Sequence, residues 1–215
     1  MALQAPQSAG SIHAASGTPE MSDNLELEAR PGLPEHLRDL LKLFPRDSWE
    51  THPNFGALTR FWLDRHGMFR DLMTHLQTDA RLMADGNMDQ QTYAHRLSRL
   101  GGMFVGELHG HHNVEDHHYF PLLAAMETRL QPGFDLLDAD HHALDEHLQA
   151  FTDEANALLT SATKMQQGEP ADMSGGAARF SDLLNGFERF LDRHLVDEEE
   201  IIVPVLLKHG EGSFG

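Results

Sequence analysis

The sequence predicts an all-α protein, an antiparallel up-down four-helix bundle with an N-terminal extension. Three observations support this fold class. Four long segments carry apolar residues at alternating spacings of three and four, the period of a helix with one buried face. Turn-forming residues separate these segments. The 215 residues, 40% of them hydrophobic and 23% charged, suffice for one domain with a buried core.

The first part of the chain differs from the rest in composition. Residues 1 to about 30 are rich in Ala, Ser, Gly and Pro and contain few large apolar side chains, which is typical of a flexible tail. A short amphipathic pattern from Leu37 to Phe44 then predicts a short helix docked on the main body. We therefore expect a tail with a docked helix over residues 1–50 and the bundle over residues 54–209.

The four predicted bundle helices each show one continuous stripe. The stripes run from Phe55 to Leu76, from Tyr93 to Leu122, from Phe134 to Leu158 and from Phe180 to Val205. Pro121 lacks the N–H that would bond back one turn, so a kink is expected near it in the second helix.

Each stripe contains a histidine at a position where an apolar residue is expected. These histidines are His66, His111, His141 and His194, and the second and fourth stripes add Glu115 and Glu198. One buried histidine with a satisfied hydrogen bond is commonplace, but one such histidine on each of four helices is not. Burying glutamate without a partner costs several kcal/mol, roughly, so a counter-charge has to meet Glu115 and Glu198. The simplest explanation is a cation site inside the bundle.

A repeated motif supports this interpretation. The segments that begin at His111 and His194 both follow the pattern His-x3-Glu-acid-x4-Pro. Residues i and i+4 of a helix lie on the same face, so each copy directs an imidazole and a carboxylate to the same space. A single copy would more simply be an exposed helical pair, but two copies that face each other would make a metal site.

Composition limits the partners and the metal chemistry. Acidic residues outnumber basic ones 34 to 16, for a formal net charge of −18, which disfavours nucleic acid and anionic membranes as partners. No apolar run is long enough to span a membrane and the first residues do not resemble a signal peptide, so a cytoplasmic location is expected. The chain has no cysteine, so a metal must use nitrogen and oxygen ligands.

The ligand set favours two ions over one. Four imidazoles and two carboxylates exceed the needs of a tetrahedral zinc and suit two octahedral ions bridged by the carboxylates. Mixed nitrogen and oxygen ligation favours iron, with manganese as an alternative. A ferritin-like carboxylate bundle is a weaker alternative, because Glu115 and His118 form one Glu-x-x-His pair but Glu198 is followed three residues later by Ile201. A structural zinc bundle is a further alternative.

With these motifs the chain resembles the hemerythrin-like proteins of the HHE cation-binding family, over about residues 54–209. The resemblance implies that His66, His111, His141 and His194 are terminal ligands and that Glu115 and Glu198 bridge two irons. Oxygen-carrying hemerythrins have a fifth histidine where this chain has Asp145, and an aspartate where it has Glu199. Iron-centre repair proteins have a cysteine-bearing domain that is absent here. These departures do not favour reversible oxygen carriage or a repair role.

Several further residues are candidates for additional ligands or for groups that hold the ligands in place. His118 lies on the stripe one turn after Glu115, whereas His112 and His142 are each one step away from a stripe histidine. His142 remains an alternative to His141, and Glu199 remains an alternative bridge to Glu198. Asp145 completes this set, while His109 and His117 are expected to face solvent.

The sequence therefore predicts a non-haem diiron protein that binds or reacts with dioxygen, peroxide or nitric oxide. His118 or Tyr119 could supply a proton for peroxide chemistry. The alternative is a non-enzymatic oxygen or iron sensor, or an oxygen-binding protein, whose fold depends on metal occupancy, because apo carboxylates in a dry core should loosen the bundle. The sequence does not decide between enzyme and sensor and does not identify a redox partner.

Overall fold

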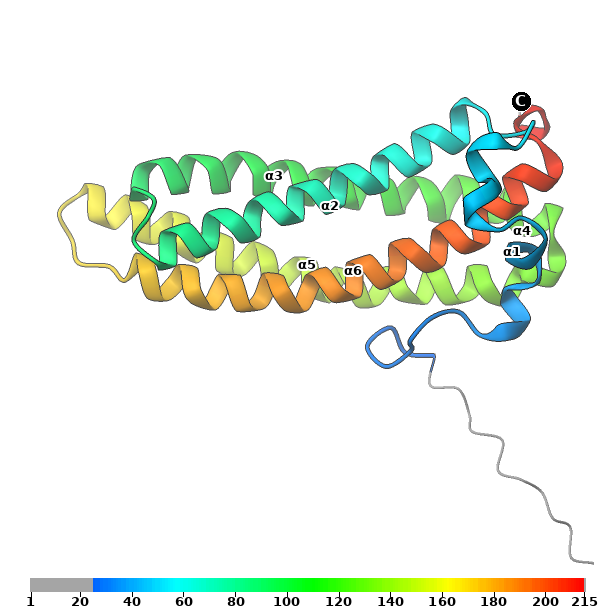
Figure 1. The fold of residues 1–215 in the computed structure, drawn as a ribbon. Helices are drawn as coiled ribbons and strands as arrows, with labels where there is room; N and C mark the ends of the chain where they lie inside the picture. The colour runs from blue at the N-terminus through cyan, green and yellow to red at the C-terminus, as the bar shows by residue number, and fades with distance from the viewer. Residues whose placement is uncertain (1–24, 215) are drawn as a thin grey trace, which may run out of the picture.

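The computed structural model describes residues 25–214 and shows four long antiparallel helices (Figure 1). The helices are α2 (Ala57–Ala84), α3 (Gln90–Val114) with its continuation, α5 (Gln131–Gln166) and α6 (Met173–His209). α2 and α5 each pack against both α3 and α6, so helices that follow one another in the chain are neighbours in space. The predicted all-α, up-down four-helix bundle is confirmed.

The second bundle helix is interrupted where the sequence predicts a kink. After α3, a π-helix, η3 (Glu115–Tyr119), leads into α4 (Phe120–Met126), which begins next to Pro121. The Phe120 N–H donates to the carbonyl oxygen of Glu115, five residues earlier. The wider turn inserts one extra residue and shifts the buried face, so Leu123 is 0% exposed whereas Leu122, on the predicted stripe, is 42% exposed.

The N-terminal segment covers one end of the bundle. It contains η1 (Glu35–Leu37), α1 (Asp39–Leu43) and η2 (Arg46–Thr51), near α4 and the C-terminal end of α6 (Figure 1). Leu37 and Leu40 join an apolar cluster with Trp62 and residues of α4, α5 and α6. The tail expected over residues 1 to about 30 lies outside the described residues up to residue 24. Leu27 and Arg30, within the remainder of that range, are buried.

The opposite end of the bundle is filled by apolar side chains. A large cluster from all four long helices contains tilted and edge-on phenylalanine pairs, with Phe104 at 5.4 Å from Phe151 and 5.7 Å from Phe187 between ring centroids. Such packing gives the helices fixed relative positions. Short connections close the bundle, and the side chain of Asp89 caps α3 by accepting from the Thr92 N–H. None of the helices formed by residues 25–214 combines the length and the hydropathy of a membrane-spanning helix.

Candidate metal centre

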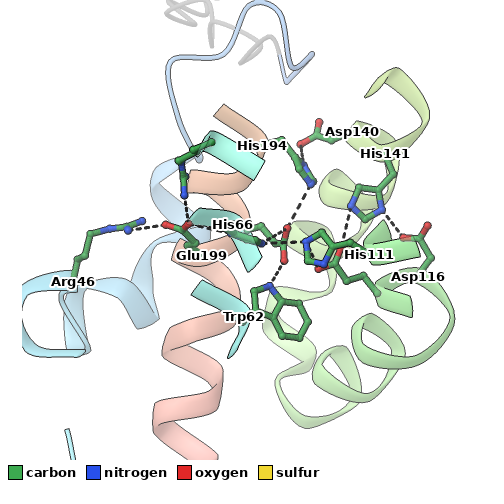
Figure 2. A network of polar contacts seen from close by, with 12 residues as sticks. Arg46, Trp62, His66, His111, Asp116, Asp140, His141, His194 and Glu199 are labelled. Atoms are coloured by element: carbon green, nitrogen blue, oxygen red, sulfur yellow. Dashed lines mark hydrogen bonds and ion pairs between the residues drawn. The ribbon is translucent and has the colours of Figure 1, made fainter. Parts of the chain in front are cut away.

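Polar side chains from all four long helices and the π-helix meet inside the bundle, and Figure 2 shows several of them directed toward one another. They form two groups, and within each group the potential ligand atoms lie within 4.8 Å of one another. We call them the His66 cluster and the His112 cluster. The first consists of His66, His111, Glu115 and Glu198, and the second of His112, His141 and His194.

The His66 cluster brings two imidazoles against two carboxylates. The Nε2 atom of His66 lies 3.2 Å from the Nε2 atom of His111 and 3.4 Å from Glu198 Oε2. The Nε2 atom of His111 lies 3.0 Å from Glu115 Oε1, one helical turn away. Trp62, from α2, donates its indole N–H to Glu198 Oε1. Four ligand atoms from three helices and the π-helix therefore share one small volume.

Both glutamates of the His66 cluster also approach histidines of the His112 cluster. Glu115 presents Oε1 to His111 and Oε2 to His141, whose Nε2 atom is 3.6 Å away. Glu198 Oε2 lies 3.4 Å from His66 Nε2 and 3.5 Å from His194 Nε2. Each carboxylate therefore lies within 3.6 Å of histidines from both clusters.

In three of the histidines a carboxylate contacts Nδ1, on the side of the ring that faces away from the clusters. The Nδ1 atom of His66 lies 3.0 Å from Glu199 Oε1, that of His141 lies 2.6 Å from Asp116, and that of His194 lies 3.3 Å from Asp140. A carboxylate acceptor places the ring proton on Nδ1 and leaves the Nε2 lone pair directed inward. This pairing fixes ring orientation and is the usual support of metal-binding histidines.

The inward-facing atoms lack partners within the described part of the chain. Seven buried side-chain atoms here have no hydrogen-bond partner: both ring nitrogens of His112, both oxygens of Glu115, Nε2 of His141 and His194, and Oε2 of Glu198. Only two other such buried atoms are found among residues 25–214. An unpaired buried polar atom costs about 1–3 kcal/mol, so a concentration of them requires a compensating group. These nitrogen and oxygen donors fit metal cations.

The charged groups of the His66 cluster shift one another's pKa values. Burial lowers the pKa of His66, but Glu198 and Glu199 outweigh burial and raise that pKa to about 9. Burial would raise the pKa of Glu198, but His66 and its neighbours hold it well below the usual range. Burial and the charge of Glu198 raise the pKa of Glu115 well above its ordinary value. A proton on His66 thus occupies the place of a cation beside Glu198.

Burial favours the neutral form of three other cluster histidines. Burial lowers the pKa of His111 to about 3 and lowers that of His112 well below its ordinary value. Burial also lowers the pKa of His194, although Asp140 acts in the opposite direction. Metal binding requires the neutral imidazole, so these three rings need lose no proton at neutral pH.

A pocket of about 380 Å³ opens onto the His66 cluster. Its walls include Phe61, Trp62 and Tyr119, and it reaches His111 and Glu115. Arg65 and Glu107 form an ion pair at the same pocket. The walls of this pocket are mainly apolar, so it admits small uncharged molecules more readily than ions.

The structure brings all six predicted principal ligands into the two clusters; their roles as ligands stay a prediction. It also places His112 in a cluster, although the sequence interpretation left this residue one step off the stripe. Glu198 faces the clusters and Glu199 lies behind His66, held by Arg46 and Arg70. His141 is buried, whereas His142 is exposed. His118 and Asp145 are also exposed; for His118 the cause is the register shift of the π-helix.

Sequence reasoning missed the groups that support the ligands. Trp62 was an apolar stripe residue, and Asp140 and Arg30 carried no motif. For Asp116 a signal existed, because Asp116 and Glu199 occupy the same acidic position of the His-x3-Glu-acid repeat. Both side chains accept from a cluster histidine. That shared position marks the carboxylates that orient the ligands.

Comparison with known protein families agrees with this geometry. The family model for the hemerythrin HHE cation-binding domain matches residues 57–206, which is most of the chain. The chain belongs to this family. No curated protein and no solved structure matched the chain in the corresponding comparisons. As a hemerythrin HHE domain the bundle is a cation-binding unit, and the two clusters are its candidate ligands.

Proposed function

We propose that this HHE domain is a non-haem diiron protein that binds or reacts with dioxygen, peroxide or nitric oxide at the His66 cluster. The observation that carries the proposal is the position of Glu115 and Glu198, each within 3.6 Å of histidines from both clusters. A shared pair of carboxylates suits two neighbouring ions. Nitrogen and oxygen ligands without cysteine suit iron, with manganese as the alternative ion.

The number of ligands supports open coordination positions. Five imidazoles and two shared carboxylates cannot fill two six-coordinate shells, so small exogenous ligands have room to bind. Oxygen-carrying hemerythrins have a further histidine in the third helix where this chain has Asp145, and Asp145 is exposed. His112, from α3, provides the additional imidazole here. In the oxygen carriers the fifth imidazole comes from the third bundle helix, which corresponds to α5. In this chain it would come from the second bundle helix, α3.

The surrounding residues suit reactions with small oxidants. Two irons, when bound, would supply the electrons for reduction of such a molecule. Phe61 and Trp62 line the pocket over the His66 cluster and limit access of water. The Trp62 N–H fixes Glu198, and Glu199 retains the proton on His66 Nδ1. Tyr119 lines the same pocket, where its hydroxyl can donate a proton; His118 is exposed and is not favoured for this role.

A second candidate function, metal-dependent sensing, is favoured by two arginines of the N-terminal segment. Arg30 is buried, donates to Asp140 at 2.7 Å and donates to Asp197 at 2.8 Å. Asp140 in turn contacts His194. Arg46 donates at 2.6 Å to Glu199, which contacts His66. Metal binding that moves either histidine would therefore alter the docking of the segment.

Metal analysis with optical spectroscopy tests the leading proposal. Protein purified without added metal should contain about two irons per chain and show near-ultraviolet absorption of a bridged pair, in keeping with two octahedral ions. Turnover of peroxide or nitric oxide that disappears in His111→Ala would support reactivity, and a reversible visible band in air would support oxygen binding. Zinc alone, or no metal, would refute the diiron assignment.

Limited proteolysis tests the sensing role, because it measures whether metal binding stabilises the docked N-terminal segment. Cleavage near residues 25–51 should be faster in the chelator-treated protein than in the metal-loaded protein if ion binding stabilises the docked segment. Arg30→Met should make cleavage fast in both states, while Arg38→Met, at an exposed arginine of the same segment, serves as the control. Equal cleavage of the wild type with and without metal would contradict the sensing role.

A further inference from the structure

A second pocket, of about 370 Å³, lies between α3 and α5 on the side of the His112 cluster. We call it the α3–α5 pocket. It is separate from the apolar pocket over the His66 cluster, and the two share no lining residue. Its floor contains His112 and His141, and its rim contains the exposed side chains of His109, His117, His142 and Asp145.

The floor of this pocket contains an unpaired buried donor. His112 is 5% exposed, and neither of its ring nitrogens has a hydrogen-bond partner within the described chain. Its ring stacks on that of His141 with centroids 4.0 Å apart, and the Nε2 atom of His141 is also unpaired. An ion that crosses the pocket would therefore meet uncompensated imidazole nitrogens at its inner end.

Two rim histidines are held through Nδ1 by backbone carbonyl groups. Nδ1 of His117 lies 2.9 Å from the backbone carbonyl oxygen of Asn113, and Nδ1 of His142 lies 2.9 Å from that of Asp138. A carbonyl oxygen can only accept, so both Nδ1 atoms carry the proton. In the neutral ring the lone pair is then on Nε2, away from the helix backbone. The same bond type prepares the histidines of metal sites.

The two pockets differ in polarity, so one suits small uncharged molecules and the other suits cations. The pocket over the His66 cluster has aromatic walls, whereas the α3–α5 pocket is lined by imidazoles, carboxylates and an amide, with Asp138 and Asp145 on α5. Fixed negative charge along a cleft attracts cations and speeds their association. A hydrated cation that exchanges water for rim ligands one at a time loses less solvation energy than one that crosses an apolar wall.

From this arrangement we infer that the α3–α5 pocket is the entry route for divalent metal ions, with rim imidazoles and carboxylates as transient ligands and His112 as the first buried ligand. The inference deepens the proposed diiron function and rests on it. The rim groups exchange an ion with solvent, and His112 and His141 pass it to the interior. The apolar pocket then remains for the small uncharged reactant.

The kinetics of metal uptake test this route. Metal-free protein is mixed with anaerobic Fe(II), and uptake is followed by quenching of tryptophan fluorescence, since Trp62 contacts Glu198 and the chain has two tryptophans. The rim variant combines His117→Ala, His142→Ala and Asp145→Asn, all at exposed positions. The matched control combines His75→Ala, His95→Ala and Asp71→Asn, which removes the same groups from exposed positions outside the pocket.

The rim variant should take up Fe(II) about tenfold more slowly than the wild type, the low end of electrostatic steering effects. Release of iron to an excess of chelator should slow by the same factor, because one route serves both directions. Iron content at saturation should be unchanged, and the control variant should match the wild type. Equal slowing of both variants, or no slowing of either, would overturn the entry route. Absence of bound iron in the wild type would instead refute the diiron proposal.

Discussion

The two copies of the His-x3-Glu-acid-x4-Pro motif fold differently. The second copy, from His194 to Pro204, lies within the continuous helix α6. The first, from His111 to Pro121, runs through the π-helix. In both copies the glutamate approaches a histidine of the His112 cluster and the following acid accepts from a histidine of another helix. The motif thus fixes the role of each side chain near the site, while the helix geometry after the glutamate is free to vary.

The first copy also provides more to the site than the second. His111 and His112 are adjacent in sequence and lie in different clusters, whereas His194 is the single cluster histidine of its copy. The two glutamates differ in environment as well. Glu198 accepts from Trp62 and faces His66, while both oxygens of Glu115 lack a hydrogen-bond partner in the described chain. Equivalent positions should therefore respond differently to equivalent substitutions.

The largest difference is expected between Glu198→Gln and Glu115→Gln in metal-free protein. Glu198 is ionised beside protonated His66, so its replacement should lower the free energy of unfolding by about 3–5 kcal/mol, as for other broken buried pairs. Burial and the charge of Glu198 raise the pKa of Glu115 and so favour its neutral form, which glutamine resembles, so Glu115→Gln should change stability by less than about 1 kcal/mol. Urea denaturation of chelator-treated protein measures both.

Both substitutions should also lower metal content, because each removes a shared anionic ligand. Equal loss of stability in the two metal-free variants would show that the glutamates are in the same protonation state. That result would contradict the assignment of the proton to Glu115.

The acids that follow the glutamates offer the next comparison. Asp116→Asn and Glu199→Gln each remove the charge behind a histidine without changing side-chain size. Each should weaken metal binding by about 10–100-fold, the usual effect of losing the group that orients a ligand. Titration against a chelator of known affinity measures the change. Asp145→Asn, at an exposed acid, is the control, and an effect as large in the control would refute an orienting role.

His66 should make metal affinity depend on pH near neutrality, whereas the repeat histidines His111 and His194 should not. His111 and His194 have lowered pKa values and are neutral at pH 7, whereas the pKa of His66 is raised to about 9. A metal must displace the proton from His66 below pH 9, so affinity should rise by about tenfold per pH unit from this group and level off above pH 9. Competition with a chelator of known affinity between pH 6.5 and pH 8 measures this slope, and an affinity that does not change with pH would contradict it.

The smallest effect is expected from Trp62→Phe. This change removes the indole N–H that donates to Glu198 and retains an aromatic ring in the pocket wall. Loss of one buried hydrogen bond should cost about 1 kcal/mol, or about fivefold in metal affinity. The same chelator titration measures it. Trp49→Phe, which removes a bond to the Phe44 carbonyl oxygen away from the clusters, should leave metal affinity unchanged.

The fold and the main candidate ligands were accessible from sequence because both are periodic. A stripe records which residues share a helix face, so a histidine or glutamate on the stripe of a regular helix is expected inside the bundle. His112 was misjudged because a site with two clusters is wide enough to receive neighbouring residues that differ by about 100°. His118 and Leu122 were misplaced because one π-turn shifts every later residue. Arg30 meets Asp140 and Asp197 across 110 and 167 residues, and such contacts leave no local pattern.

The position of His194 and Glu198 on α6 also bears on the order in which the protein is made. Synthesis proceeds from α2 toward α6, so His66, His111, His112 and Glu115 leave the ribosome before the residues that complete both clusters. The partners of Arg30 and Arg46 on α6, Asp197 and Glu199, arrive equally late. Neither cluster can close, and the N-terminal segment cannot dock fully, until α6 has joined the bundle. A complete centre therefore cannot assemble before α6 has been translated.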